Sequence, residues 1–323
     1  MNYNKGSIKY DLIGGVSVAA LSIPIAVAFA EIAGMPPKSG IYTAVIALVA
    51  YFFLGSSDHA IIGTDFPTVT LFAAVVIAAI GSNHPSAPQF MMMITVMAGI
   101  WMIVAGLLKL GFIASFLSKP VLLGYLNGVS LMLIVSQLDK LTGINLEQEA
   151  FFRRIVEVLA KAHLVNWPTL FLGIASILFL LLFSRVSAKV PSAIILLVIS
   201  AIASLLFDLG TVGIAFMPAI QDPYPNFVLP DANLFLDHFP DLFFASAAVM
   251  FVSYSGAVPV VRGFSKDTKG FDPNKEFYAL GVAHVLIGFF GGYPVSADDS
   301  RTAVNVGVVL VLTVIVSVAV VAH

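Results

Sequence analysis

Long apolar runs separated by short polar turns make up most of the chain. A helix that crosses a bilayer needs about 20 mostly apolar residues, or about 17 at the short end. By this criterion the pattern predicts membrane-spanning helices over Asp11–Ala33, Gly40–Leu54, Gln89–Leu108, Pro120–Leu138, Trp167–Phe183, Pro191–Phe207, Asp241–Val261 and Glu276–Phe290, before a final apolar segment, Val306–His323. We therefore expect an all-α polytopic membrane protein.

Two further apolar segments are interrupted by residues that do not suit the middle of a helix. The stretch Ala60–Thr68 contains a glycine and a proline and precedes an apolar run to Ile80 that is too short to span alone. The second stretch, Gly291–Asn305, holds glycines, a proline, two carboxylates and an arginine. Non-helical backbone is tolerated at bilayer depth only where it is buried in protein or lines a cavity. Each segment is therefore predicted to be extended chain followed by a half-helix, and the second is predicted to form one wall of a binding site.

The two interrupted segments occupy corresponding positions in two halves of the chain. One follows the second predicted span, and the other follows the second span after the polar, proline-rich segment 208–240. Short, interrupted segments placed in this way indicate an inverted-repeat transporter with its site near the membrane midplane. We expect the repeat to begin again near Asp241 with opposite orientation.

The composition narrows the class of protein further. Hydrophobic residues make up 59% of the chain and charged residues only 11%, whereas about 25% charged residues is usual for soluble proteins. The chain has no cysteine, which excludes disulfides and thiolate metal sites. Lysine and arginine are too sparse for a nucleic-acid partner. The histidines show no ligand spacing, so we expect no metal, and no nucleophile–base pair suggests an enzyme.

The distribution of basic residues predicts the orientation in the membrane, because short cytoplasmic loops carry an excess of lysine and arginine. Lys5 and Lys9 indicate a cytoplasmic N-terminus, and the polar Met1–Tyr10 shows no pattern of a removable signal peptide. The segment 208–240 then falls outside, and the mixed-charge segment 139–166 is predicted to lie on the surface as an amphipathic helix. We expect an integral protein of a bacterial-type inner membrane.

Several motifs resemble, in order, those of the sulfate permease (SulP) anion transporters. They are Pro24–Ala44 in the first span, Leu117–Gly128 at the fifth, and the stretches Asp272–Glu276, Gly288–Gly292 and Ser300–Asn305 around the ninth span and the second interrupted segment. The resemblance covers nearly everything from Asp11 to Asn305.

This resemblance implies fourteen segments in two inverted repeats of seven, with half-helices as the third and tenth segments and a division into core and gate domains. Here residues 1–207 would form the first repeat, 208–240 an outside loop and 241–323 a partial second repeat. Asn305 runs straight into the last apolar segment where the family supplies about four more helices. Either the second gate is shortened or intervening residues are missing from the sequence, and we expect no STAS domain.

The resemblance also implies a set of site residues around the two half-helices. Carried over by motif, the predicted substrate-binding residues are Ala28, Phe29, Ala30, Phe66, Thr68, Ser253, Gly256, Ser296, Ala297, Ser300 and Arg301. The candidates for binding a coupling ion, Na⁺ or H⁺, are Asp298, Asp299, Asp65 and Glu31. Many members carry a helix-eight carboxylate near the position of Gly256, which this chain lacks, and the acids at 298 and 299 are unusual for the family.

Structural roles compete with these assignments. Ser296 and Asp299 have the spacing of a capping box, and Asp65 is placed to cap the helix after it. Arg301 either pairs with Asp298 or Asp299 or contributes to substrate binding. The run Met91–Met93 is interpreted as packing or lipid-facing.

The predicted function is secondary active transport of a small anion such as sulfate, bicarbonate or a dicarboxylate. The resemblance implies an elevator-type motion of core past gate. Asp298 and Asp299 lead us to expect coupling to H⁺ or Na⁺, and we expect no cofactor. The predicted partners are the anion and the bilayer, with a homodimer as a further prediction. The alternatives are a nucleobase/H⁺ symporter of the related fold and a non-transporting membrane scaffold.

Overall fold

The computed structural model describes residues 8–80, 86–112, 128, 131, 134–135, 137–146, 148, 150–186, 192–207, 211, 213–214, 225, 227–264 and 271–305. The chain divides into two compact units, one formed by residues 1–118 together with 220–323 and the other by residues 119–219. The predicted span Pro120–Leu138 lies mostly outside the described residues, and Val306–His323 lies wholly outside them.

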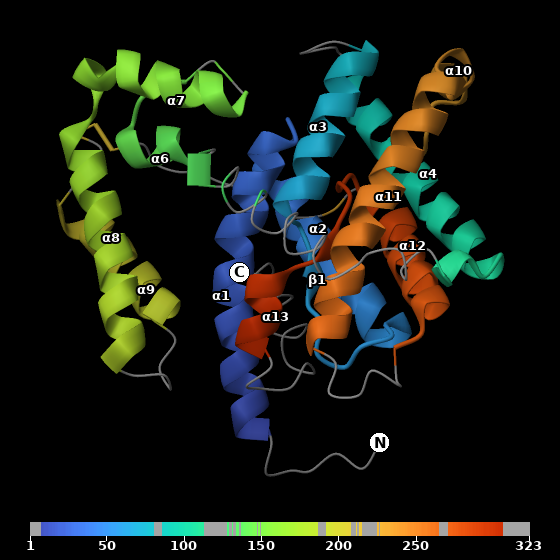
Figure 1. Ribbon diagram of the computed structural model, residues 1–323, viewed down its shortest axis with the longest axis horizontal. Coiled ribbons are helices and arrows are strands. Elements are labelled where there is room, and N and C mark those ends of the chain that lie inside the picture. Colours follow the sequence, from blue (N-terminus) through green and yellow to red (C-terminus); the bar gives the residue numbers. More distant parts are fainter. Residues whose placement is uncertain are drawn as a thin grey trace. The chain divides into compact units, whose positions relative to one another are not determined.

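Five long helices form the framework of the first unit, and each matches a predicted span within a few residues. They are α1 (Ile8–Ile32), α2 (Pro37–Leu54), α4 (Ala87–Leu107), α11 (Phe239–Phe264) and α12 (Pro273–Phe289) (Figure 1). Four of them, all but α12, contain stretches long and apolar enough to cross a membrane. Local signals explain two of the starts: Pro37 stands in the first turn of α2, and the Asp272 carboxylate caps α12 by accepting from Asn274 N at 2.9 Å.

Both interrupted segments adopt the predicted extended chain followed by a helix. The first contains β1 (Ile62–Gly63) and then α3 (Phe66–Ile80), and the second contains β2 (Ser296–Ala297) and then α13 (Asp299–Asn305). Sequence patterning did not predict that β1 and β2 would pair as antiparallel strands, with Ile62 opposite Ala297 and Gly63 opposite Ser296. The order of two long helices, a short strand and a further helix therefore occurs twice in this unit.

The helices α4 and α12 are in backbone contact along a seam of glycines. A Cβ atom added to Gly281 would lie 2.8 Å from the carbonyl oxygen of Gly99, and one added to Gly99 would lie 2.6 Å from the carbonyl oxygen of Gly281. Such distances leave no room for any side chain, and small residues commonly permit this approach between membrane helices. The neighbouring Met91–Met93 run is buried, as the packing interpretation predicted.

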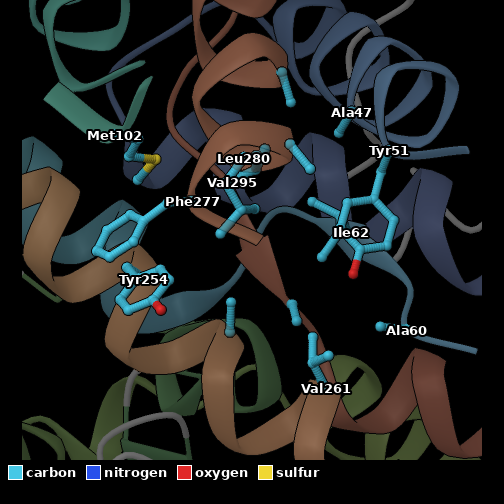
Figure 2. Packing of buried hydrophobic residues seen from close by; sticks show 14 of the residues in the cluster. Ala47, Tyr51, Ala60, Ile62, Met102, Tyr254, Val261, Phe277, Leu280 and Val295 are labelled. Atoms are coloured by element: carbon cyan, nitrogen blue, oxygen red, sulfur yellow. The ribbon is translucent and has the colours of Figure 1, made fainter. Parts of the chain in front are cut away.

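The core of the first unit includes residues of both extended segments. Figure 2 shows Ile62 and Val295 within the same buried cluster as Tyr254 and Phe277, whose rings are stacked with centroids 3.4 Å apart. The extended chain is thus enclosed by helices, and such burial in protein is what a membrane requires of backbone that is not helical.

A buried carboxylate holds the end of α2 against the start of α12. Glu276 is fully buried, and its Oε2 atom accepts hydrogen bonds from the Tyr51 hydroxyl at 2.9 Å and from Ser56 Oγ. Ser56 belongs to the turn that leads into β1, so this contact also fixes where the first extended segment begins.

The second unit contains α6 (Leu138–Thr142), α7 (Phe151–Ala160), the short 3₁₀ helix η3 (Ala162–Leu164), α8 (Trp167–Val186) and α9 (Ser192–Phe207), with α8 packed against α6 and α9. The predicted amphipathic helix corresponds to α7, in which Phe152 and Leu159 are exposed. The polar segment 208–240 contains a helix that patterning did not predict, α10 (Ala232–Asp237), which belongs to the first unit and is capped by the Asp231 carboxylate.

Candidate functional site

The two extended segments meet at a buried junction where β1 leads into α3 and β2 leads into α13. Outside the paired strands, Asp298 N–H donates to the carbonyl oxygen of Ile61 at 3.0 Å, and Ile61 N–H donates to Thr302 Oγ1 at 3.0 Å. The two helix starts are therefore tied together by backbone and side-chain hydrogen bonds, and residues far apart in sequence form one compact site.

Arg301 lies at the centre of this junction and is 1% exposed. Its Nη2 atom donates to the carbonyl oxygen of Thr64 and lies 3.3 Å from Asp298 Oδ2. The guanidinium also lies directly against β1, because a Cβ atom on Gly63 would be only 2.6 Å from Arg301 Nη1. Of the two interpretations of Arg301, the ion pair with Asp298 is confirmed, and the pair brings positive charge to the strand of the opposite segment.

Each helix start is capped by an aspartate. Asp65 Oδ2 accepts from Thr68 N at 3.3 Å, as its predicted capping role requires, and Asp298 Oδ1 accepts from Arg301 N at 2.7 Å. The predicted capping box of Ser296 and Asp299 is wrong. Pairing with β1 holds Ser296 in extended conformation, so the helix starts later and Ser296 Oγ instead donates to the carbonyl oxygen of Ser253 at 2.7 Å.

Several buried polar atoms at the junction have no hydrogen-bond partner among the described residues. They are Thr64 Oγ1, Asp65 Oδ1, Thr68 Oγ1 and Arg301 Nε. Thr64 and Thr68 are fully buried and Asp65 is 8% exposed. Buried polar groups are nearly always hydrogen-bonded, so a cluster of this kind calls for an explanation such as water or a ligand. The atoms offer hydroxyl donors, a carboxylate acceptor and a guanidinium N–H.

Helices α1 and α11 bring the other predicted residues to the same place. The rings of Phe29 and Phe66 have centroids 6.3 Å apart. A Cβ atom on Gly256 would lie 2.9 Å from Ser296 Oγ and 4.0 Å from Asp65 Oδ2, so the side-chain-free surface of α11 faces the capped start of α3. Ala28 is partly buried, Ala30 is fully buried, and Ala297 on β2 is buried with 6% of its surface exposed.

Two of the predicted coupling residues have a different environment from the junction residues. Glu31 and Asp299 are both exposed, whereas Asp65 is buried and Asp298 is engaged with Arg301. The side chain of Ser300 lies outside the described part of the structure.

Sequence reasoning missed Gly63, Thr64, Tyr293 and His284 as contributors to the junction. Tyr293 is fully buried, its hydroxyl donates to the carbonyl oxygen of Ala26 at 2.7 Å, and its backbone N–H donates to Thr43 Oγ1 at 3.1 Å. Gly63 and Thr64 could have been suspected because they occupy the extended stretch next to Asp65. For His284, a polar side chain in the middle of an apolar span was the available signal.

Comparison with known proteins places the chain in one family. The model of the family described as "Sulfate permease family" matches residues 8–323. The chain is 30% identical over 302 residues to the probable sulfate transporter MT1781 of Mycobacterium tuberculosis, covering 93% of this chain and 54% of that protein. It is 30% identical over 312 residues to the putative sulfate transporter YvdB of Bacillus subtilis, covering 94% of this chain and 57% of that protein. The chain thus spans about half the length of these curated relatives.

Solved structures share the fold. The structure of SLC26A9 superposes with a TM-score of 0.84 at 21% identity, over 99% of this chain and 54% of that one. The transmembrane domain of the cyanobacterial bicarbonate transporter BicA superposes with a TM-score of 0.80 at 21% identity, over 99% of this chain and 82% of that one. At this identity the likeness shows the fold, which is that of helical membrane domains.

Proposed function

Because the chain belongs to the sulfate permease family, whose members are permeases rather than enzymes, we propose that it contributes the anion-binding part of a secondary active transporter. The observation that carries the proposal is the junction itself: a buried arginine, the start of α3 and unpartnered hydroxyls gathered in a membrane domain. We propose a small inorganic or organic anion as the substrate. Sulfate is the first candidate, because the relatives are named as sulfate transporters. Bicarbonate is the second, because a structural neighbour is a bicarbonate transporter, and a dicarboxylate is the third.

Electrostatics at the junction support anion binding. The N-terminus of a helix carries about half a positive charge and exposes N–H groups, both of which favour an anion. In this proposal the start of α3 supplies that field, Arg301 supplies a full charge held in place by Asp298, and the hydroxyls of Thr64 and Thr68 donate to the anion. Phe29 and Phe66 would close the apolar side of the site.

Asp65 is the coupling group that the geometry favours among the four candidates. Asp298 already caps α13 and pairs with Arg301, and the other two candidates are exposed. Asp65 is buried, with Oδ1 unpartnered among the described residues. An ionised carboxylate at this place would repel an incoming anion. We therefore propose that Asp65 takes up H⁺, or binds Na⁺, when the anion binds.

The architecture supports a repeat-based mechanism. The two halves of the first unit have the same order of elements, and β1 and β2 pair in antiparallel fashion, as segments of opposite orientation would. We propose inverted repeats over residues 1–207 and 241–323, joined by an outside loop at 208–240, in a bacterial inner membrane with the N-terminus in the cytoplasm. The first compact unit would be the core and the second the gate, moving as an elevator, with a homodimer as the proposed assembly.

Uptake into liposomes tests these assignments directly. The purified protein should accumulate radiolabelled sulfate or bicarbonate when an inward H⁺ or Na⁺ gradient is imposed. The variant Asp65→Asn keeps an oxygen that can cap α3 but cannot take up a proton, so it should still exchange anion while losing its response to the gradient. Asp299→Asn is the matched control because that side chain is exposed. If both variants keep the gradient response, Asp65 is not the coupling group.

A second candidate function is nucleobase/H⁺ symport, which the unpartnered Oδ1 of Asp65 favours because it could accept a ring N–H. Uracil or adenine should then compete with labelled substrate, whereas sulfate should not. A chain that carries neither class of solute would instead support the scaffold alternative.

A further inference from the structure

The extended segment that leads into β2 is held by side chains from several helices. Val295 shows this most clearly: its carbonyl oxygen accepts from Ser253 Oγ on α11, and its N–H donates to His284 Nε2 on α12 at 3.2 Å. No regular secondary structure satisfies these groups, and unsatisfied backbone groups at bilayer depth cost several kcal/mol each. The two side chains therefore hold the residue directly before Ser296 in place.

The hydrogen bonds of His284 assign the position of its proton. The ring is fully buried, with Nδ1 2.7 Å from the carbonyl oxygen of Leu280 and Nε2 3.2 Å from the backbone N of Val295. A carbonyl oxygen only accepts and a backbone N–H only donates. Nδ1 must therefore carry the proton, and Nε2 must be the unprotonated acceptor. Both ring nitrogens are thereby used within the protein, so His284 is not free to contact a transported solute.

We infer that His284 is a positioning residue for the anion site. As a neutral acceptor from Val295 it sets the backbone path of residues 295–297, and through the β1–β2 pairing it sets the distance between the starts of α3 and α13. The effect of His284 on anion binding rests on the proposed function, but its effect on the backbone of residues 295–297 does not.

Two conservative substitutions separate the roles of the ring nitrogens. The amide of glutamine reaches the place of Nε2, so His284→Gln retains an acceptor for Val295. The amide of asparagine reaches only the place of Nδ1, so His284→Asn leaves the Val295 N–H unpaired. Loss of one buried hydrogen-bond partner is expected to weaken anion affinity about tenfold or more in His284→Asn. His284→Gln should stay within about threefold of the parent, a smaller loss because the acceptor is kept.

A second readout does not depend on transport. The chain has no cysteine, so Ala297→Cys introduces a single thiol at a position that is 6% exposed. This thiol should resist a small maleimide in the parent and in His284→Gln, and should react in His284→Asn. Ala47→Cys, on α2 and fully buried, should stay unreactive in all three backgrounds and so reports whether the helices remain folded. If the thiols are protected as expected but the cysteine-free protein moves no anion, the result would count against the proposed function while leaving His284 in its role.

The tautomer itself can be observed in the unmodified protein. With ¹⁵N-labelled histidine, the resonances of His284 should show one protonated nitrogen and one unprotonated nitrogen that accepts a hydrogen bond. A doubly protonated ring, a proton on Nε2, or an equally unreactive thiol at 297 in His284→Asn would overturn the inference.

Discussion

Replacing Gly63 with alanine is the sharpest perturbation of the junction, because the added methyl group would point at a buried charge. The new Cβ atom would lie 2.6 Å from Arg301 Nη1 and 3.2 Å from its Cζ. The guanidinium is the tip of a flexible side chain, so it can retreat from the methyl group. It cannot reach water without leaving its partners, however, because Arg301 is 1% exposed.

The cost of Gly63→Ala should therefore come from lost hydrogen bonds rather than from steric overlap. Hydrogen bonds to charged groups contribute about 1.5–3 kcal/mol each, and Arg301 binds both the Thr64 carbonyl oxygen and Asp298. Replacing glycine with alanine also stabilises the folded state by about 0.4–1 kcal/mol, because alanine lowers the conformational entropy of the unfolded chain. We expect a net destabilisation of about 2 kcal/mol, roughly a 4 °C fall in melting temperature for a chain of this size.

Thermal unfolding of the purified protein in detergent measures this effect. Gly263→Ala is the matched control, since its Cβ atom would meet nothing within 4 Å on α11. It should not lower the melting temperature. The double variant Gly63→Ala/Arg301→Gln should be little worse than Arg301→Gln alone, because the methyl group acts through the guanidinium. Equal melting of Gly63→Ala and Gly263→Ala would refute this account of the junction.

Two other contacts make separate predictions. Gly281→Val should destabilise the first unit more than Gly63→Ala does, because its Cβ atom meets the backbone of α4 rather than the tip of a flexible side chain. Thermal unfolding measures the loss, with Gly263→Val as the control. Equal melting temperatures for Gly281→Val and Gly263→Val would contradict the close packing of α4 and α12. Glu276→Ala should cost about 2 kcal/mol or more by leaving the buried Tyr51 hydroxyl and the half-buried Ser56 hydroxyl without this acceptor. Glu276→Gln keeps an acceptor and should lose less, and an equal loss in the same unfolding assay would contradict the hydrogen-bond explanation.

The lengths of the apolar runs and the cost of burying charge were enough to predict the five long helices of the first unit and the two interrupted segments. These are local properties: a span such as α4 is visible in its own residues, and so is the proline-containing start of α3. The capping aspartate at position 65 was predictable for the same reason. Pairing between β1 and β2 was not, because two-residue strands carry no alternation and their partner lies in the other half of the chain.

The same limit explains the errors at the second half-helix. Ser296 has the right spacing to cap a helix, and only the tertiary pairing with Gly63 keeps it extended. From sequence alone Arg301 could pair with an aspartate or bind a ligand, and the pair could be established only from the position of Asp298 in space. His284 stood out as polar, but its acceptor role depends on a backbone group eleven positions away.

During synthesis, β1 reaches the bilayer long before its partner exists, since Thr64 and Arg301 are 237 positions apart. At about 5–20 residues per second, translation separates the two by roughly 10–50 s. Throughout that interval the backbone groups of β1 have no strand to bind, and lipid offers no substitute. Insertion of the first half must therefore leave this segment in contact with water, the translocon or a chaperone. The site is completed in one late step, when the second half arrives and both segments leave that environment together.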